Sequence, residues 1–231
     1  CVLNKASIEA IAAAQKIGSD LGIKASAVIF CDKECPISGE IAGYDLEKVI
    51  VAKNEKLAQY TPDAYADALS EIIEAEKPKY VVMSHTYQVR DFAPKVAARV
   101  GRELVGDCIR YRVDGGKLVL TRRIFLGKLD ADVSLGGDAP YFVTFQSGAF
   151  RSDDAAAGTA QVESRDVSVG AVRMTSEAAF QEAKASVDLS KSNVIVAIGR
   201  GIKSQENIAL AEKLAEVLGG DLAASRPICD S

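Results

Sequence analysis

An arginine flanked by two glycines is the first group of residues whose types and spacing suggest chemistry. Gly199-Arg200-Gly201 comes shortly after the apolar run 193–196, which predicts a strand, and precedes a stretch with helical periodicity. A turn of this kind brings the free N–H groups of a helix start next to the end of a strand, which suits an anion. Ser204 stands at the third glycine position of the GxGxxG dinucleotide pattern. The Walker A pattern of phosphate-binding loops needs a glycine directly before its Lys-Ser pair, and here Ile202 precedes Lys203-Ser204. Two interpretations stay open: a phosphate-binding turn, or a tight turn in which the glycines permit the backbone and Ser204 caps the helix.

A second arginine follows the last apolar run of the chain. In Ser225-Arg226-Pro227 the proline biases Arg226 toward an extended conformation, which would hold the guanidinium at the end of a strand. Arg200 and Arg226 would then lie at adjacent strand ends. This placement favours an anionic ligand site, and a structural salt-bridge pair is the alternative.

The only histidine of the chain, His85, follows the apolar run 79–84. Open α/β sheets bind ligands at the carboxyl ends of their strands, so a nucleotide site near His85 and Thr86 is one hypothesis. Nucleophilic catalysis needs a positioned partner, and no cysteine or serine stands at a spacing that would supply one. A structural role for His85 is the favoured interpretation.

Other charged and thiol side chains are expected to be structural. Four carboxylates are interpreted as solvated loop charges, because acid–base catalysis needs a cleft: Asp130, Asp132, Asp153 and Asp154. The pair Arg122 and Arg123 is interpreted as marking an exposed strand edge or a protein interface. The five cysteines include no CxxC pair, so neither a disulfide framework nor a zinc site is predicted, and Cys31 and Cys35 are interpreted as incidental thiols. We predict no catalytic residue and no metal site.

Composition excludes several classes of protein. The 231 residues are 48% hydrophobic and 26% charged, enough to bury a core, and the length predicts one complete domain with part of another. A net charge of −4 argues against binding driven by nucleic-acid phosphates. No apolar run reaches the roughly 18 residues that cross a bilayer, and the first ten residues lack signal-peptide features. We expect no membrane insertion and a cytoplasmic location, or the mitochondrial matrix in a eukaryote.

The first hundred residues alternate between strands and helices, which predicts a parallel sheet with helical crossovers. Strands are expected over 25–30, 48–53 and 79–84. Helices are expected from a cap at Ser7 to Ile17, from a cap at Thr61 with Pro62 in the first turn, and over 91–100.

The pattern changes after Gly106. Asp114-Gly115-Gly116 lies between two alternating runs and predicts a hairpin, so that antiparallel strands extend the parallel core. The small polar segment 151–170 favours an excursion or linker, and 175–190 predicts a helix. A domain boundary near residue 187 divides the chain into 1–187 and 188–231.

Four blocks of the sequence resemble electron transfer flavoprotein alpha subunits. They occur in the family order and together cover most of residues 5–231. The blocks are TYQVRDFAPKVAARVGRELVGDC (86–108), PYFVTFQSGAF (140–150), GRGIKSQEN (199–207) and ASRPICD (224–230).

The resemblance implies a heterodimer with a beta subunit, in which FAD carries electrons between flavin-dependent dehydrogenases and an acceptor. The family's FAD contacts fall here on Gly199, Arg200, Gly201, Ser225 and Arg226, and the arginine that matches Arg226 lies against the flavin ring. Such a subunit is an electron carrier with no catalytic residue of its own. The implied fold is a parallel α/β domain with an antiparallel extension, followed by the start of a second α/β domain that binds FAD.

The chain also departs from the family pattern. It lacks the family's strand ahead of the first helix and the later FAD loops, so we expect it to be a fragment whose own FAD binding is incomplete or absent. Gln146 and FLGK (125–128) are smaller departures. Two alternatives stay open: an interaction module that docks the beta subunit, and a nucleotide-binding α/β protein that uses His85.

Overall fold

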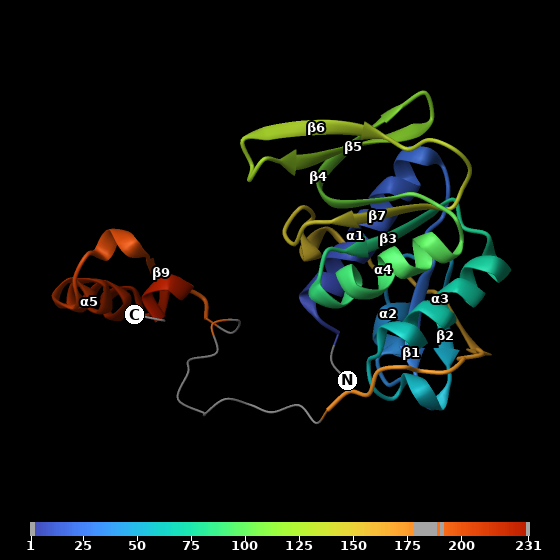
Figure 1. The fold of residues 1–231 in the computed structure, drawn as a ribbon, viewed down its shortest axis with the longest axis horizontal. Coiled ribbons are helices and arrows are strands. Elements are labelled where there is room, and N and C mark those ends of the chain that lie inside the picture. The colour runs from blue at the N-terminus through green and yellow to red at the C-terminus, as the bar shows by residue number, and fades with distance from the viewer. Residues whose placement is uncertain (1–2, 178–188, 190–191, 230–231) are drawn as a thin grey trace. The chain divides into compact units, whose positions relative to one another are not determined.

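A computed structural model of the chain describes residues 3–177, 189 and 192–229. Residues up to Glu177 form one compact unit, and residues from Ala178 onward form a second. Figure 1 shows the helices and strands of both units. The helix predicted over 175–190 and the boundary predicted near residue 187 fall largely outside the described residues, so both stay predictions.

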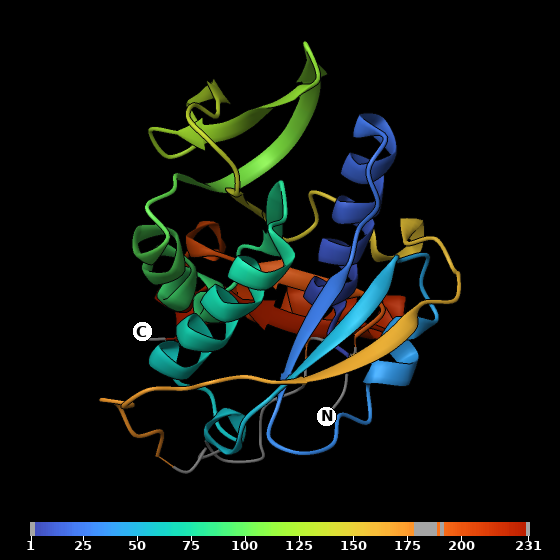
Figure 2. The same ribbon diagram turned by 90° about the vertical axis from the view of Figure 1, so that its right-hand side faces the viewer.

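Three parallel strands form the first sheet of the N-terminal unit. They are β1 (Ala27–Cys31), β2 (Lys48–Lys53) and β8 (Gln161–Asp166), in the order β1-β2-β8, and they lie side by side in Figure 2. The first two strands were predicted, but the interpretation of 151–170 as an excursion or linker is wrong. It contains β8, an edge strand held to β2 by backbone pairing, while its flanking residues Ala160 and Val167 are buried.

Five strands form the second sheet, in the order β3-β7-β4-β5-β6. They are β3 (Tyr80–Ser84), β4 (Leu104–Asp114), β5 (Lys117–Ile124), β6 (Leu129–Ser134) and β7 (Tyr141–Phe145). The predicted hairpin joins β4 to β5, where Gly115 and Gly116 have φ of 55° and 75°, as a type I′ turn requires. β4 and β5 are antiparallel as predicted, and β6 adds a further antiparallel strand beside β5, whereas β7 lies between β3 and β4 and runs parallel to both.

The first helix begins earlier than we predicted. α1 (Lys5–Leu21) is capped by Asn4, whose Oδ1 accepts from the backbone N–H and the hydroxyl of Ser7 at 2.8 and 3.0 Å. The cap predicted at Ser7 is therefore wrong, because Asn4 supplies a good acceptor one turn earlier.

The next two long helices are capped by threonines. α3 (Pro62–Glu76) starts as predicted, with the Ala64 N–H donating to Thr61 Oγ1 at 3.3 Å. α4 (Tyr87–Arg99) starts four residues earlier than predicted, because Thr86 Oγ1 accepts from the Val89 N–H at 3.2 Å. The remaining short helices of this unit are α2 (Ser38–Ala42), η1 (Glu55–Leu57) and η2 (Ser152–Asp154).

Helices cover both faces of the two sheets. Along β2, Val49 packs with Ile11 of α1, whereas the next residue, Ile50, packs with α3. β7 alternates in the same way, since Val143 packs with α1 and Phe142 with α3 and α4. Because successive strand residues point to opposite faces, α1 covers one face and α3 and α4 the other. Burial on both faces explains the nearly continuous apolar runs of these strands.

A segment without regular structure, residues 168–173, runs along α3 and is held by that helix's carboxylates. Three side chains spaced four residues apart each accept a backbone N–H from the segment. The donor–acceptor pairs are Ser168–Glu71 (2.8 Å), Gly170–Asp67 (2.8 Å) and Arg173–Asp63 (3.0 Å). The N-terminal unit is thus an α/β fold with an antiparallel extension, which confirms the predicted class, although its parallel strands belong to two sheets.

Candidate functional site

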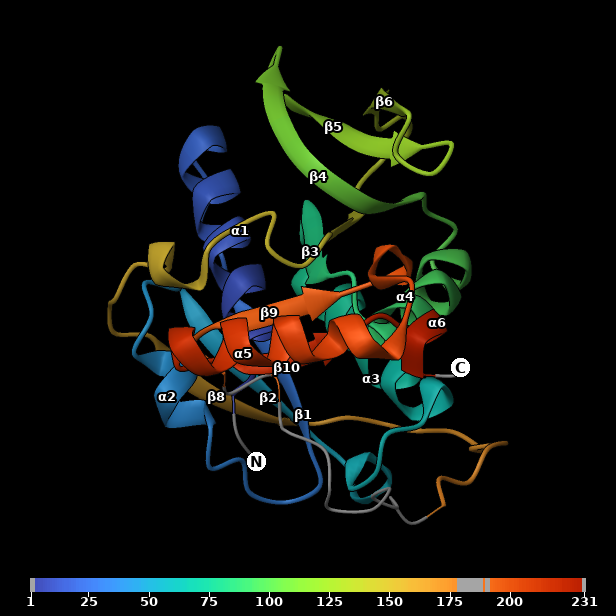
Figure 3. The same cartoon turned by 90° about the vertical axis from the view of Figure 1, so that its left-hand side faces the viewer.

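The C-terminal unit consists of two parallel strands joined through a helix. β9 (Ile195–Ile198) pairs with β10 (Asp221–Ala224), and α5 (Ile208–Leu218) connects them and lies along β9 in Figure 3. Between β9 and α5 the chain forms two short 3₁₀ turns, η4 (Arg200–Ile202) and η5 (Gln205–Asn207). Among the described residues of this unit only Ala215 is fully buried, so the predicted strand–turn–helix arrangement is present with a small core.

The two arginine-bearing turns lie side by side at the carboxyl ends of the strands. The Ser225 N–H donates to the Ile198 carbonyl at 2.9 Å, which continues the pairing of β9 and β10 by one step. A Cβ placed on Gly199 would lie 3.7 Å from Ser225 Oγ. The Gly199-Arg200-Gly201 turn and the Ser225-Arg226 pair therefore share one edge, as the sequence predicted.

Neither glycine of the turn is required by its own backbone or by its neighbours. Gly199 has φ of −135° and ψ of −169°, an extended conformation that any residue adopts. Gly201 is absent from the residues with positive φ, and a Cβ built on it meets no described atom within 4 Å. The interpretation that these glycines serve a tight turn therefore lacks support in the described residues. At Gly201 this leaves open space next to the backbone, as required where a ligand approaches closely.

The residue after η4 has a strained backbone. Lys203 has φ of 66° and ψ of −44°, and the Ser204 N–H donates to the Ile202 carbonyl at 2.8 Å. This is a classic γ-turn, a rare conformation for a residue with a side chain. Such strain costs about 1–3 kcal/mol and concentrates at ligand sites. Sequence reasoning missed Lys203, since nothing in its residue type indicates positive φ.

Ser204 does not cap α5. It precedes η5 and makes no side-chain cap hydrogen bond, and α5 begins at Ile208. The amide of Asn207 instead donates to the Ile202 carbonyl at 2.7 Å, which closes the turn from within. The interpretation of Ser204 as a helix cap is wrong, because η5 separates Ser204 from the helix.

Arg226 is helical rather than extended. It begins the four-residue α6 (Arg226–Cys229), because the Ser225 carbonyl accepts from the N–H groups of Ile228 and Cys229 at 2.8 and 3.3 Å. Pro227 fits at the second position of a helix, where no N–H is needed. The conformation we predicted is therefore wrong, but the placement of Arg226 directly after β10 is right.

His85 has a structural setting. Its backbone N–H donates to the Phe145 carbonyl at 2.7 Å, and its Nδ1 lies 2.7 Å from Thr144 Oγ1, which also accepts the Asp107 N–H at 3.1 Å. Burial lowers the pKa of His85, opposed by Asp107 and assisted by Arg90 and Arg122. Thr86 caps α4 with its hydroxyl. These contacts agree with the structural role that the sequence favoured.

Two of the carboxylates and the paired arginines lie elsewhere than expected. Asp130 and Asp132 are on β6, not in a loop, and form ion pairs with Arg110 and Arg112 of β4 at 3.1 and 3.3 Å. The strand that carries Arg122 is not an edge, since β5 is paired on both sides. Sequence reasoning missed β6 because its alternating charges resemble a loop.

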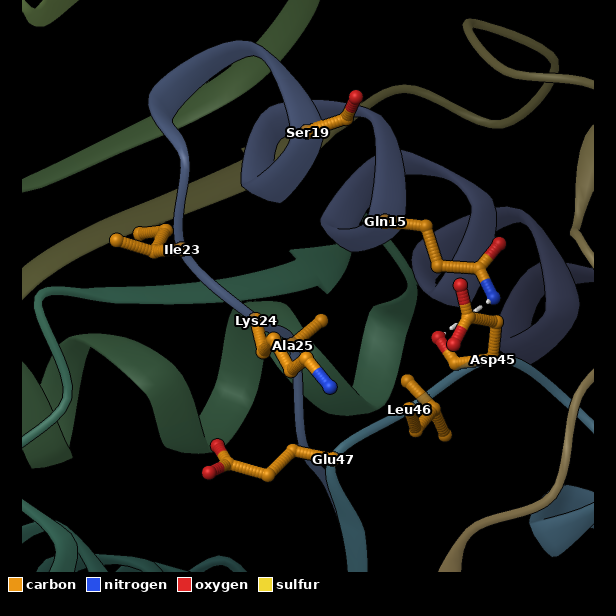
Figure 4. Close-up of a pocket in the computed structure, with 8 residues that line it drawn as sticks. All are labelled: Gln15, Ser19, Ile23, Lys24, Ala25, Asp45, Leu46 and Glu47. Carbon is orange, nitrogen blue, oxygen red and sulfur yellow. Dashed lines mark hydrogen bonds between the residues drawn. The ribbon is translucent and has the colours of Figure 1, made fainter.

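A hollow of about 200 Å³ lies at the amino ends of the strands of the first sheet, where the chain enters β1 and β2 (Figure 4). Gln15 lines it, but its amide is used within the protein: Nε2 donates to the Asp45 and Ala156 carbonyls at 3.1 and 3.0 Å, and Oε1 accepts from the Ala156 N–H at 2.8 Å. This amide joins α1 to two loops. The hollow is thus a seam of the fold at the end of the sheet where α/β proteins do not bind ligands.

Comparison with known proteins agrees with this architecture. Residues 2–170 match the electron transfer flavoprotein domain, and residues 188–231 match the electron transfer flavoprotein FAD-binding domain. The two matches define a flavoprotein electron carrier.

Similar proteins narrow the class. The electron transfer flavoprotein subunit alpha of Bacillus subtilis is 35% identical over 99% of this chain and 70% of its own length. Protein FixB of Clostridium saccharobutylicum is 32% identical over 97% and 68%. The acryloyl-CoA reductase electron transfer subunit beta of Anaerotignum propionicum is 30% identical over 96% and 70%. The chain belongs to the electron transfer flavoprotein alpha subunit family and has an electron-transfer role, as the resemblance implied. Within the described residues, no helix is long and apolar enough to span a membrane.

Proposed function

We propose that this chain is the alpha subunit of a heterodimer with a beta subunit, and that it holds FAD at the edge formed by Gly199-Arg200-Gly201 and Ser225-Arg226. The observation that carries the proposal is the open space at Gly201 beside two arginine-bearing strand ends. The residues fit the group: exposed cations for a diphosphate, and backbone that a ligand can approach closely. The strained Lys203 in the same turn supports a ligand role for this edge.

FAD, when bound, supplies the electron-transfer chemistry, and the chain's residues bind and tune it. A permanent cation in contact with a reduced, negatively charged flavin contributes a few kcal/mol, which for one electron is on the order of 100 mV. Arg226 is the residue we assign to this task, following the family resemblance, with Arg200 and the turn assigned to holding the cofactor. The electrons would come from flavin-dependent dehydrogenases, in keeping with the name of the acryloyl-CoA reductase relative.

The experiment is a titration of the bound flavin in the full-length heterodimer. Arg226→Ala should lower its reduction potential by on the order of 100 mV, or release the flavin altogether. Arg226→Lys keeps the charge, so its reduction potential should lie between those of the unchanged protein and Arg226→Ala. Lys213→Ala removes an exposed cation from α5 and serves as the control. An Arg226→Ala protein that binds flavin at an unchanged potential would contradict the proposal.

One observation favours the interaction-module alternative. The turn between β5 and β6 carries two exposed apolar residues, Phe125 and Leu126, which are 70% and 103% accessible and have φ of 51° and 57°. Apolar side chains held outward on strained backbone are typical of a contact surface. Phe125→Asn and Leu126→Asn should keep the turn, because asparagine tolerates positive φ. Loss of the beta subunit with these variants would assign docking to the turn, and unchanged co-purification would exclude it.

A further inference from the structure

Asn207 precedes the first residue of α5, but its side chain does not cap that helix. Asparagine is among the best capping residues, because its side-chain oxygen can accept an N–H from the first turn of a helix. Here the amide reaches back along the chain instead, and its Nδ2 donates to the Ile202 carbonyl at 2.7 Å. The side chain of Asn207 therefore supports the turn that carries Arg200 rather than the helix that follows.

The Ile202 carbonyl accepts two hydrogen bonds from residues that follow it. The Ser204 N–H donates at 2.8 Å and closes the γ-turn in which Lys203 has φ of 66° and ψ of −44°. The second bond, from Asn207, crosses from η5 to the last residue of η4. The amide of Asn207 is thus a brace across the strained part of the turn.

The strain at Lys203 requires such support. A positive φ is unfavourable for a residue with a side chain, so it persists only where the surrounding structure holds it. The peptide group that carries the braced Ile202 carbonyl also carries the Lys203 N–H, which donates to the Arg200 carbonyl at 3.3 Å. One peptide group therefore links the amide of Asn207 to the conformation of Arg200.

The same turn presents two backbone donors. The N–H groups of Arg200 and Gly201 make no hydrogen bond to a described residue, and both residues are exposed. The space next to Gly201 is open. Successive unpaired N–H groups in a turn suit an anion such as a phosphate group. Their direction depends on the conformation of η4, which the peptide between Ile202 and Lys203 closes.

We propose that Asn207 is a positioning residue for the cofactor, and that its amide holds the turn in the conformation in which Arg200 and the unpaired N–H groups bind FAD. The inference rests on the proposed FAD site and goes beyond it, because Asn207 acts through the turn and not by touching the cofactor. Since the brace supports the strained Lys203, a change at either residue should alter the effect of a change at the other.

The test measures the dissociation constant for FAD, by flavin fluorescence, in flavin-depleted full-length heterodimer. Asn207→Ala should raise this constant by about 2-fold to about 13-fold, which corresponds to the loss of one hydrogen bond. Asn207 is exposed and its side chain does not cap α5, so the variant should fold as the unchanged protein does. Gln205→Ala is the matched control, because Gln205 is exposed in the same 3₁₀ turn and its side chain bonds to no described residue. It should bind FAD as tightly as the unchanged protein.

A double-mutant cycle with Lys203→Gly shows whether Asn207 acts through the turn. Glycine adopts positive φ without strain, so the turn needs less support from the brace. Asn207→Ala should therefore weaken FAD binding by a smaller factor in the Lys203→Gly background than in the unchanged protein. An equal or larger factor in the glycine background would overturn the positioning role.

Hydrogen exchange on the flavin-free heterodimer gives a readout that does not involve the cofactor. Asn207→Ala should speed exchange of the Ser204 N–H, which closes the γ-turn, and Gln205→Ala should not. Gly201→Ala separates the two proposals. If it weakens FAD binding and Asn207→Ala does not, the site stands and the positioning role is overturned. If neither variant changes the dissociation constant, both proposals are overturned.

Discussion

Replacing Gly201 with alanine separates folding from cofactor binding. A Cβ at this position meets no described atom within 4 Å, and the backbone φ lies outside the positive region. The methyl group therefore fits the chain itself, and the loss of glycine's freedom in the unfolded state should raise stability by about 0.4–1 kcal/mol. For a protein of this size this is a rise of a few degrees at most in the melting temperature of the flavin-free protein.

FAD binding should change in the opposite direction. If the open space at Gly201 is where the cofactor approaches, the added methyl group overpacks the complex by about 1–3 kcal/mol. The dissociation constant for FAD would then rise by between about 5-fold and about 150-fold. Flavin-depleted full-length heterodimer titrated with FAD, followed by flavin fluorescence, measures this constant.

A matched control comes from Gly39 in α2, where a Cβ also meets nothing within 4 Å. Gly39→Ala should raise stability by a similar amount and leave FAD binding unchanged. Equal FAD affinity for Gly201→Ala and the unchanged protein would refute the assignment of this turn. Unfolding of Gly201→Ala would refute the steric reasoning behind it.

Two further predictions concern the N-terminal unit. Gly158→Ala should destabilise this unit by about 1–3 kcal/mol, because the new Cβ would lie 2.5 Å from the Asp45 Cα, a backbone atom that cannot move aside alone. Chemical denaturation measures the loss of stability. A stability equal to that of Gly39→Ala would contradict this prediction. Asp63 is buried and accepts from Lys95 Nζ at 2.7 Å and from the Arg173 N–H, which hold the pKa of its carboxyl well below its usual range. A depressed pKa in the folded state contributes stability that is present above the unfolded value of about 3.8 and is lost as the pH falls below it. Asp63→Asn should therefore be less stable than the unchanged protein at pH 7, with a difference that shrinks below pH 4, and a pH-independent difference would show that the charge is not responsible.

The alternation of strands and helices was predictable because strands that are buried on both faces have nearly continuous apolar runs in the sequence. The run KVIVAK gives β2 directly, since Val49 packs with α1 and both Ile50 and Ala52 pack with α3. Gly115 and Gly116 were equally informative, because the hairpin turn needs positive φ at both. The shared edge of the two arginine-bearing turns followed from topology, as the carboxyl ends of parallel strands meet at one side of a sheet.

Other features depend on competition between local interactions, which the pattern of apolar and polar residues does not show. β8 was missed because an edge strand keeps polar side chains and needs no apolar run to pair with its neighbour. Ser7 is a good cap residue, but Asn4 is an equally good one and caps the helix one turn earlier. Arg226 becomes helical because the Ser225 carbonyl is available to two N–H groups, which outweighs the bias that Pro227 imposes.

The most direct test of where the cofactor lies is hydrogen exchange on the full-length heterodimer with and without FAD. The account predicts that FAD slows exchange of the backbone N–H groups in residues 199–204 and 225–229, and leaves the start of α4 at residues 85–90 unchanged. Slower exchange at residues 85–90, with no change at the two arginine-bearing turns, would contradict it and favour the nucleotide site near His85.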